Sequence, residues 1–345
     1  MVLVDRRIDR ILVIKLRAIG DVLLSTVVLK SLRDAFPQSA IDFLTENASR
    51  EVLAGNPWVN SIVSYNSTAM GSLSLVAEVR RGRYDLVIDL FGNPRSAVVT
   101  YASGARWRVG YRFGWRQYCY NIVVEPRGGE VHNTEFNLDA LRAIGVPVTE
   151  SAAYFPVDEG SKRFAGEFFA EKKLTDAFVV ALNPGGGWRA KRWGIRQLAE
   201  FADLIVNRHG ARVVIVWGPG EREGAEQVRS LMKSAADLIP PANLKQLGAI
   251  LRLTSVLVTN DSGPMHIAAT LGTPVVAIFG PTRPQLQGPV GSDAEVIQNR
   301  KLLCLGCNFT ECPIGNPCMT ELSAEHVYEG FCRLLTKIGV PAQGS

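Results

Sequence analysis

The chain has 345 residues, more than a single domain usually holds, so we expect two domains. Its 47% hydrophobic and 21% charged residues are typical of a globular protein, and its net charge of +5 comes without a long Lys/Arg block, which argues against nucleic acid as a partner. Because no apolar run reaches about 18 residues and charges interrupt the N-terminal apolar residues, we predict no membrane-spanning helix or signal peptide and expect a cytoplasmic protein.

The first half of the chain alternates strand-like and helix-like segments. Short β-branched runs predict strands at 10–15, 41–45 and 84–90, and apolar residues at helical spacing predict helices at 22–36 and 133–144. Pro37 and Gly145 end these two helices. We assign residues 1–155 to a first domain.

The second half repeats the alternation after a junction at about 146–176, which we interpret as a helix flanked by polar turns. Strands are expected at 178–182, 212–217, 255–259 and 274–279, helices at 195–208 and 264–271, and a last amphipathic helix at 324–338. This places a second domain at 175–323. Alternating strands and helices predict parallel sheets with helices on both faces, and ligands then lie beyond the carboxyl ends of the strands, in a cleft between the domains.

The loop after the first strand, Leu16 to Asp21, combines a glycine with a carboxylate. Gly20 permits a tight turn, and Asp21 lies at the start of the next helix, near Lys15 and Arg17. Asp21 is either a helix cap or a carboxylate base with basic residues nearby for an anionic substrate. The absence of G-x-G-x-x-G from this loop argues against a dinucleotide dehydrogenase.

The loop after the strand at 178–182 reads NPGGGWRAKRW and begins at Asn183. Its three glycines let the backbone approach a ligand closely, and Lys191 and Arg192 add positive charge. The loop is either a flexible turn or an anion site, and glycines beside two cations favour the anion site. It is not a P-loop, because G-x-x-x-x-G-K-[ST] is absent.

The strand at 255–259 opens into the polar stretch NDSGP, residues 260–264. Asp261 or Ser262 can accept bonds from the N–H groups of the helix that follows, and Pro264 suits its first turn. A helix N-terminus at the end of a parallel strand attracts anions, phosphate above all. The stretch is either a well-capped helix start or a diphosphate site, and we favour the diphosphate site.

Two further features are open to two interpretations each. Glu221, in the loop after the strand at 212–217, either bonds ribose hydroxyls or caps the next helix. Four cysteines lie within fifteen residues, in the pattern C-x2-C-x4-C-x5-C: Cys304, Cys307, Cys312 and Cys318. They form either a reduced cluster that packs a loop or a structural zinc or iron–sulfur site, and the spacing matches no standard metal site.

Taken together and in this order, the loops resemble glycosyltransferase family 9, the ADP-heptose:lipopolysaccharide heptosyltransferases, over nearly the whole chain. The marks are R-x-I-G-D at Arg17–Asp21, K-x-W at Lys191–Trp193 and D-[ST]-G-x-x-H at Asp261–His266, followed by A-x-x-L-G-x-P at Ala268–Pro274 and F-G-P-T at Phe279–Thr282. Residues 92–97 and 103–111 resemble the heptosyltransferase III-type branch.

The resemblance implies a GT-B fold: two facing Rossmann-like domains with parallel sheets, an interdomain cleft, and a last helix at 324–338 that crosses back to the first domain. It implies an inverting, metal-independent transfer of heptose from ADP-L-glycero-D-manno-heptose to the lipopolysaccharide inner core, without a cofactor. The donor would bind the second domain and the acceptor the first.

The resemblance also implies roles for single residues. Asp21 is the catalytic base, and Lys191 stabilises the charge on the departing ADP. The implied donor-binding residues are Gly186, Gly187, Glu221, Leu244, Asp261, Ser262, Gly263, Met265 and His266, and the implied acceptor-binding residues are Lys15, Arg17, Arg95, Arg112 and Arg116. His266 has a second interpretation as a packed core histidine, and each arginine has one as a solvated surface residue.

The implied acceptor is the lipid A–Kdo core, which is anchored in the inner leaflet. We therefore expect peripheral contact with the cytoplasmic face of the membrane. The predicted contact stretch holds Trp107, Arg108, Arg112, Trp115 and Arg116.

Three other functions are compatible with parts of the pattern. One is a family 9 hexosyl- or N-acetylhexosaminyltransferase that uses another nucleotide sugar. Another is a non-catalytic protein that binds sugar nucleotides, against which Asp21 and Lys191 argue. The third is a two-domain sugar-nucleotide epimerase, which lacks a second acid/base partner in the sequence.

Overall fold

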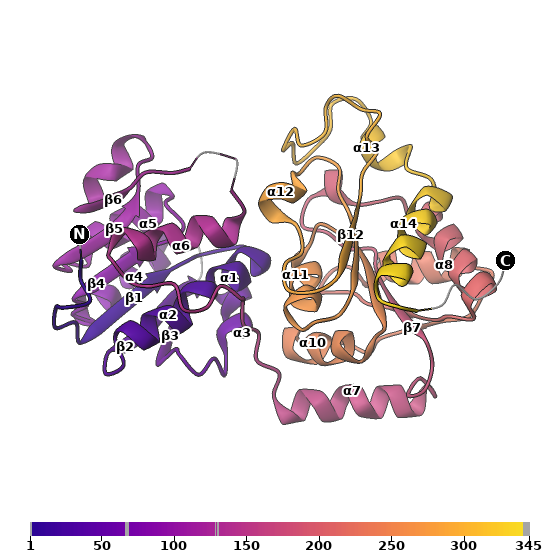
Figure 1. Ribbon diagram of the computed structural model, residues 1–345, viewed down its shortest axis with the longest axis horizontal. Coiled ribbons are helices and arrows are strands. Elements are labelled where there is room, and N and C mark those ends of the chain that lie inside the picture. The colour runs from indigo at the N-terminus through magenta and orange to yellow at the C-terminus, as the bar shows by residue number, and fades with distance from the viewer. Residues whose placement is uncertain (1, 66–68, 128, 130, 341–345) are drawn as a thin grey trace. The chain divides into compact units, whose positions relative to one another are not determined.

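Each half of the chain builds one six-stranded parallel sheet. The computed structural model describes residues 2–65, 69–127, 129 and 131–340 (Figure 1). These residues divide into two compact units, unit 1 from Met1 to Pro156 and unit 2 from Val157 to Ser345. None of the described helices combines the length and the apolar character needed to cross a bilayer.

Unit 1 has its strands in the order β3-β2-β1-β4-β5-β6, with every neighbouring pair parallel. Its strands are β1 (Arg10–Ile14), β2 (Ala40–Glu46), β3 (Ser61–Tyr65), β4 (Leu86–Asp89), β5 (Trp107–Tyr111) and β6 (Ile122–Val124). Its helices are α1 (Ile19–Ser25), α2 (Val27–Ala35), α3 (Arg50–Leu53), α4 (Ala69–Arg81), α5 (Pro94–Ala102) and α6 (Asn133–Ala143), with the 3-10 turns η1 (Asn47–Ser49) and η2 (Gly114–Cys119).

Unit 2 has the order β12-β11-β10-β7-β8-β9, again with parallel pairs throughout. Its strands are β7 (Val179–Asn183), β8 (Arg212–Ile215), β9 (Ala236–Leu238), β10 (Val256–Asn260), β11 (Val275–Ile278) and β12 (Ala294–Ile297). Its helices are α7 (Glu159–Glu171), α8 (Ile195–His209), α9 (Arg222–Leu231), α10 (Leu244–Leu253), α11 (Gly263–Thr270), α12 (Pro284–Gln287), α13 (Pro317–Thr320) and α14 (Ala324–Lys337), with the 3-10 turn η3 (Arg189–Lys191).

Both sheets follow one topology. Three strands run outward in one direction, and the fourth returns beside the first, so the direction of winding reverses between β1 and β4 in unit 1 and between β7 and β10 in unit 2. The helices that leave the two central strands at such a reversal cover opposite faces, which opens a crevice at the carboxyl ends of the strands. The predicted pair of Rossmann-like α/β domains with parallel sheets is confirmed. The way in which the two units face each other, including the predicted cleft, stays a prediction.

The core of unit 2 includes the terminal helix. Val327 and Phe331 of α14 are fully buried with side chains of α8 and of the central strands, and α14 packs on α8, β11 and β12. Helix α7, which we had placed in the junction, belongs to unit 2 and packs on α10. The predicted return of α14 to the first domain concerns the arrangement of the two units, and it stays a prediction.

One predicted helix is divided in two. The segment expected as a single helix at 22–36 consists of α1 and α2, which meet at Thr26. The hydroxyl of Ser25 donates to the carbonyl of Val22 at 2.7 Å, and the hydroxyl of Thr26 donates to that of Leu23 at 2.7 Å. Hydroxyls that bond to the preceding turn compete with the backbone ladder and bend helices.

Candidate functional site

In unit 1 the crevice between β1 and β4 holds two buried charged side chains. Lys15 follows β1, and its ammonium donates to the carbonyl of Leu90 at 3.0 Å. Burial lowers the pKa of Lys15, while the negative charges of Asp21 and Asp89 oppose that shift. Asp89 ends β4 with no exposed surface, and burial raises the pKa of its carboxyl. The predicted acceptor-binding residue Lys15 therefore lies beneath the crevice.

Three hydrogen-bond donors surround the Asp89 carboxylate. The N–H groups of Phe91 and Gly92 donate to Oδ1 at 3.0 and 2.9 Å, and the hydroxyl of Tyr120 donates to Oδ2 at 2.7 Å. These bonds hold the loop that leads into α5, so Asp89 fixes the backbone on one side of the crevice.

Asp21 lies at the third position of α1 and is partly exposed. Its Oδ2 accepts from the backbone N–H of Ala18 at 3.2 Å, and its Oδ1 lies 3.5 Å from the amide nitrogen of Asn133, the first residue of α6. Asp21 therefore has a helix-start contact, as one interpretation of the sequence expected, and also keeps a carboxylate at the mouth of the crevice. Asn133 was missed by the sequence analysis, because nothing in the local pattern relates it to Asp21.

The predicted acceptor arginines have different surroundings. Arg17 is exposed. Arg95 donates to the hydroxyl of Tyr65 at 3.2 Å. Arg112 pairs with Glu125 at 2.5 Å and donates to Gln117 at 2.6 Å, while Arg116 donates to the carbonyl of Phe113 at 2.9 Å.

In unit 2 two asparagines end the central strands. Asn260, at the end of β10, donates to the carbonyls of Pro184 and Gly185 at 3.2 and 2.9 Å and accepts from the N–H of Trp193 at 3.0 Å. Asn183, at the end of β7, donates to the hydroxyl of Ser262 at 3.0 Å. These amides fix both ends of the glycine-rich loop against β10. Sequence analysis assigned them no role, although polar residues at the ends of buried strands were a usable signal.

The cation and the carboxylate predicted on separate loops meet in the structure. The ammonium of Lys191 lies 2.7 Å from Oδ2 of Asp261, and both side chains are largely buried, with 12% and 4% of their surface exposed. The hydroxyl of Thr282 donates to the same oxygen at 2.7 Å, and the ring of Trp188 lies 4.4 Å from the ammonium. Asp261 thus holds Lys191, and Thr282, from the F-G-P-T segment, holds Asp261.

Helix α11 begins beside this pair without a side-chain cap. The prediction that Asp261 or Ser262 caps it is wrong, since Asp261 bonds to Lys191 and Thr282 while the Ser262 hydroxyl bonds to Thr259 at 3.0 Å and to Asn183. The helix starts at Gly263, so its first N–H groups and positive dipole end are oriented toward the end of the sheet, where an anion can bind.

Glu221 joins two backbone loops. Its carboxylate accepts from the N–H of Gly186 at 3.2 Å and of Gly218 at 3.1 Å, and its side chain does not cap α9. A Cβ at Gly185 would lie 2.4 Å from this carboxylate, so a larger residue there displaces the Glu221 side chain, whereas a Cβ at Gly187 would meet nothing within 4 Å. The capping interpretation of Glu221 is therefore wrong.

The other predicted donor residues are partly or fully covered. Met265 has no exposed side-chain surface and His266 is buried, so either residue reaches a ligand only through its backbone or after movement. Leu244 is the first residue of α10, directly after its cap Asn243, and is half-buried.

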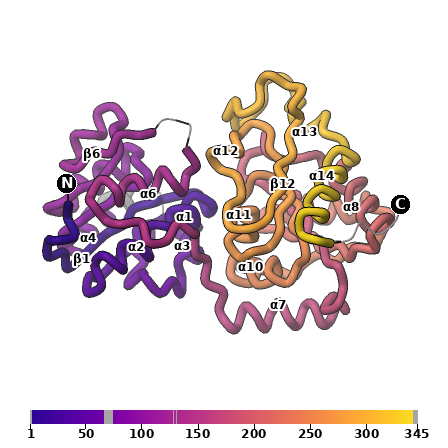
Figure 2. Tube along the Cα trace, in the orientation of Figure 1, coloured from indigo at the N-terminus to yellow at the C-terminus, as the bar shows by residue number. Residues whose placement is uncertain are grey.

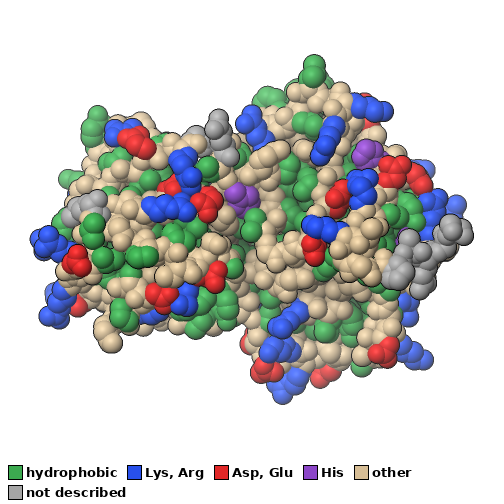
Figure 3. Space-filling model, in the orientation of Figure 1, with side chains coloured by type: hydrophobic (Ala, Val, Ile, Leu, Met, Phe, Trp, Pro, Cys, Tyr) green, Lys and Arg blue, Asp and Glu red, His purple; other side chains and the backbone are tan. Residues whose placement is uncertain are grey.

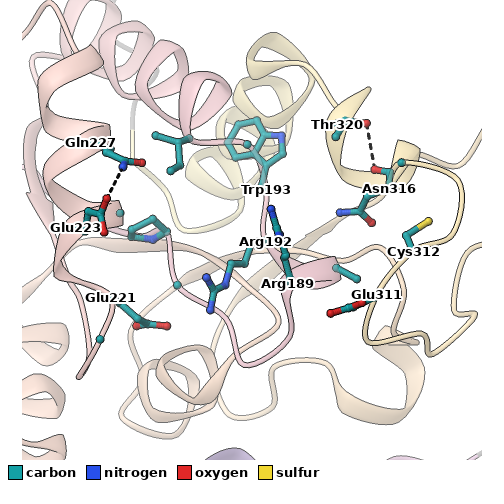
Figure 4. Close-up of a pocket in the computed structure, with 18 residues that line it drawn as sticks. Arg189, Arg192, Trp193, Glu221, Glu223, Gln227, Glu311, Cys312, Asn316 and Thr320 are labelled. Carbon is teal, nitrogen blue, oxygen red and sulfur yellow. Dashed lines mark hydrogen bonds between the residues drawn. The ribbon is translucent and has the colours of Figure 1, made fainter.

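A cavity of about 810 Å³ opens on the α8 and α9 side of the glycine-rich loop (Figure 4). Arg189, Arg192 and Glu221 lie on one side of it, and Asn316 and Cys312 on the other. Of the predicted donor residues only Glu221 lines this cavity. Lys191 and the start of α11 are not among its lining residues, so the cavity adjoins the proposed phosphate site without containing it.

The four clustered cysteines differ in their exposure to solvent. Cys304 and Cys307 are exposed, Cys312 is half-buried and Cys318 is buried. In the part of the chain that the structure describes, no three His, Cys, Asp or Glu side chains are placed to hold one ion. The geometry thus gives no support to the metal-site alternative that the sequence left open.

Comparisons with known proteins agree with these features. The family model for glycosyltransferase family 9 (heptosyltransferase) matches residues 72–316. Lipopolysaccharide core heptosyltransferase OpsX of Haemophilus influenzae is 25% identical over 83% of this chain and 83% of its own length, and lipopolysaccharide heptosyltransferase 3 of Escherichia coli K12 is 28% identical over 76% and 80%. The structure of the E. coli ADP-heptose lipopolysaccharide heptosyltransferase II has a TM-score of 0.76 at 23% identity and covers 96% of this chain and 99% of its own.

Proposed function

Because the chain belongs to glycosyltransferase family 9, and is therefore a glycosyltransferase of the lipopolysaccharide heptosyltransferase family, we propose that it transfers heptose with inversion from ADP-L-glycero-D-manno-heptose to the lipopolysaccharide inner core. The observation that carries this proposal is the Lys191–Asp261 pair beside the uncapped start of α11. A cation and a helix N-terminus at one sheet end are suited to a diphosphate.

Unit 2 binds the donor in this proposal. The diphosphate lies at the start of α11, where the N–H groups of Gly263, Met265 and His266 face it, and the Lys191 ammonium turns from Asp261 toward the outer phosphate. Glu221 contacts the ribose hydroxyls, and Leu244 lines the adenine pocket. Gly186 and Gly187 let the loop backbone approach the ligand.

Unit 1 supplies the base. A sugar hydroxyl is a weak nucleophile until its proton is removed, and Asp21 is the carboxylate at the mouth of the crevice. Asp21 takes the proton from the acceptor hydroxyl, the oxygen bonds to the anomeric carbon, and the bond from that carbon to the ADP oxygen breaks. The electron pair stays on the outer phosphate, where Lys191 and the α11 dipole stabilise it.

The acceptor in this proposal is the lipid A–Kdo core. Arg17, Arg95, Arg112 and Arg116 supply cations for its carboxylates and phosphates. Arg112 pairs with the exposed Glu125 and donates to the neutral Gln117, and Arg116 donates to the carbonyl of Phe113, so a ligand anion can replace these contacts. The buried Lys15 supplies a positive charge near Asp21.

The acceptor is anchored in a lipid leaflet, and we infer that the exposed face of α5 and η2 rests on that surface. Residues 90–124 contain five arginines and no aspartate or glutamate. The two elements pack together over a small core with Ala97 and Cys119, and their outer side exposes Val98, Tyr101, Trp115 and Tyr118. Aromatic residues among arginines suit the headgroup region of an anionic membrane. This face would hold the enzyme at the cytoplasmic side of the inner membrane.

Vesicle sedimentation tests the membrane part. The native protein is expected to bind vesicles with anionic lipids and to release them at high salt, and a Trp115→Ala/Tyr118→Ala variant is expected to bind about 10-fold more weakly. Replacing the exposed α9 arginines, Arg222→Gln and Arg229→Gln, is the matched control and should change nothing. Equal binding of the aromatic variant and the native protein would remove this face from the proposal.

Calorimetric binding of ADP, UDP and GDP in EDTA tests the donor. ADP is expected to bind best, and without a divalent cation, because Lys191 and α11 supply the positive charge. Preference for UDP or GDP would favour a family 9 hexosyl- or N-acetylhexosaminyltransferase. Binding of ADP without turnover of ADP-heptose on a lipopolysaccharide core would favour a non-catalytic sugar-nucleotide-binding protein.

We place the chain in the heptosyltransferase III-like branch. The 28% identity to lipopolysaccharide heptosyltransferase 3 supports this placement, and it is slightly higher than the 25% identity to OpsX. Turnover on cores that end at successive inner-core sugars tests this placement, because it shows which acceptor the enzyme uses.

A further inference from the structure

A long segment without helix or strand carries the cysteines. It runs from residue 298, after β12, to residue 316, before α13, and forms the orange-to-yellow loop at the upper edge of unit 2 in Figure 2. Leu303, Phe309 and Ile314 on this segment are exposed, whereas Leu302 and Leu305 are partly buried against the core of unit 2. Figure 3 shows a hydrophobic side chain at that edge. Irregular segments of this length inside a compact domain are uncommon and are usually functional.

Contacts with the rest of unit 2 hold the segment in place. The N–H of Gly306 donates to the carbonyl of Gly280 at 3.1 Å, and the N–H of Asn308 donates to that of Pro281 at 2.6 Å. The carbonyl of Thr310 accepts from the N–H of Ala190 at 3.3 Å. The segment is thus tied to two loops that lie far apart in the sequence.

Both loops lead to the same ion pair. Ala190 precedes Lys191, and Pro281 precedes Thr282, whose hydroxyl bonds to the Asp261 oxygen that faces the Lys191 ammonium. The segment therefore hydrogen bonds to the backbone next to Lys191, at Ala190, and to the backbone next to Thr282, at Pro281.

The buried cysteine lies at this junction. A Cβ at Gly280 would lie 2.7 Å from the sulfur of Cys318 and 2.7 Å from the sulfur of Met319. Burial, together with the negative charges of the other three cysteines, raises the pKa of Cys318 to about 11, so its thiol stays neutral and packs as an apolar group. Gly306 has φ +71, and a Cβ there would meet Arg283 at 2.7 Å, so the backbone path of the segment is closely specified.

We propose that residues 304–318 are a positioning element of the donor site, which fixes the Lys191 ammonium relative to Asp261 through the turn at 189–191 and the strand end at 280–282. This inference rests on the proposed role of Lys191 at the donor phosphate. It assigns the cysteine segment to the donor site.

ADP affinity in a double-mutant cycle tests the proposal. Gly280→Ala inserts a methyl group against Cys318 and disturbs the segment without touching the ligand. It is expected to weaken ADP binding about 5-fold in the native background. In the Lys191→Ala background it is expected to leave ADP affinity unchanged, because the effects of coupled residues are not additive. Gly166→Ala, in α7 with nothing within 4 Å of the new Cβ, is the matched control and is expected to leave affinity unchanged.

Each outcome of the cycle has a separate meaning. An equal loss in both backgrounds, or no loss from Gly280→Ala in a folded protein, overturns the positioning role. An unchanged ADP affinity in Lys191→Ala contradicts the proposed function at Lys191 and leaves the segment without the partner through which it acts. A 5-fold loss that disappears in Lys191→Ala supports both.

A second measurement needs no substitution. Iodoacetamide alkylates a thiolate, forming a sulfur–carbon bond and releasing iodide, and the rate at the half-buried Cys312 rises when the segment exposes more of its thiol. Because coupling between two sites is reciprocal, saturating ADP is expected to slow alkylation of Cys312 about 5-fold. Cys332, which is also half-buried but lies on α14, is the internal control, and its alkylation rate should be the same with and without ADP. Equal rates at Cys312 with and without ADP contradict the proposal.

Discussion

Unit 1 and unit 2 have one strand order and yet opposite chemistry at the point where their winding reverses. In unit 1 the crevice floor holds buried charges, Lys15 and Asp89. In unit 2 the same places near the strand ends hold neutral amides, Asn183 and Asn260. The difference follows from the backbone around each side chain. Two N–H groups and a hydroxyl point at Asp89, whereas two carbonyls and one N–H point at Asn260.

This comparison shows how one topology serves two tasks. In unit 1 the buried Lys15 lies close enough to Asp21 that the negative charge of Asp21 opposes the lowering of the Lys15 pKa by burial. A neutral floor in unit 2 leaves the Lys191–Asp261 pair and the α11 dipole as the charges that face a ligand. The fold provides the crevice, and the side chains at the strand ends decide what it binds.

The largest expected effect tests the chemistry of unit 1. Asp21→Asn is expected to lower kcat about 1,000-fold, because the amide cannot take the acceptor proton. ADP affinity is expected to stay unchanged, since the proposed donor contacts are in unit 2. Steady-state kinetics and calorimetry measure the two quantities. Undiminished turnover would remove Asp21 from the base role, and a parallel loss of ADP binding would contradict the division of tasks between the units.

The second prediction exchanges the charged side chain at the end of β4 with the neutral one at the end of β10. Asn260→Asp places a carboxylate against the carbonyls of Pro184 and Gly185 and is expected to lower the free energy of unfolding by about 3 kcal/mol. The reverse change, Asp89→Asn, is expected to cost less than about 1.5 kcal/mol, because an amide oxygen still accepts from Phe91 and Gly92 and its NH2 can donate to Tyr120.

Urea unfolding at pH 7 measures both variants of that exchange. Equal losses of unfolding free energy would show that the local donors and acceptors do not explain why Asp89 is charged and Asn260 is neutral.

The third prediction concerns the glycine-rich loop, which unit 1 lacks. Gly185→Ala forces the Glu221 carboxylate away from its place and is expected to weaken ADP binding about 10-fold, as for the loss of one ribose contact. Gly187→Ala is the matched variant, with open space around the new methyl group, and should change affinity less than 2-fold. Calorimetry compares the two. Similar affinities for both would show that the loop tolerates bulk and that Glu221 does not depend on it.

The smallest effect is on stability and concerns the packing of α14 on unit 2. His209, at the end of α8, hydrogen bonds to Tyr328 at 2.9 Å, packs on Phe331 and lies 4.0 Å from the Cys332 sulfur. Burial, and then the charge of Arg208, lowers its pKa below the ordinary 6.5. The unfolded chain therefore binds the proton more readily than the folded protein. Stability is full above pH 6.5 and falls as the pH drops from 6.5 toward the folded pKa, by at most about 1.4 kcal/mol per pH unit.

Unfolding by urea between pH 7 and pH 5 measures this slope, with His209→Gln as the reference. The variant lacks the titrating group, so its stability should fall less over the same interval. Identical pH dependence in the native protein and the variant would show that His209 keeps an ordinary pKa.

Much of the fold was readable from the chain. Buried strands such as β1, β7 and β10 are short β-branched runs, and the glycines after α8 and α11 mark helix ends, so their positions needed no partner. Five strands were missed: the edge strands β3, β6, β9 and β12, and β5, which lies between β4 and β6. β9, with three half-buried residues, and β12 form only because a neighbouring strand offers a free edge.

The sequence by itself determined which loops are candidates for the chemistry, because Asp21, Lys191 and Asp261 each follow a recognisable strand and lie in family motifs. Only the tertiary structure decided what these side chains do to one another. The pairing of Lys191 with Asp261, the bond from Thr282 and the contact of Asn133 with Asp21 join residues 21 to 112 positions apart. Local periodicity carries no information on such pairs, since the winding of the sheet, which brings distant strand ends to one edge, creates them.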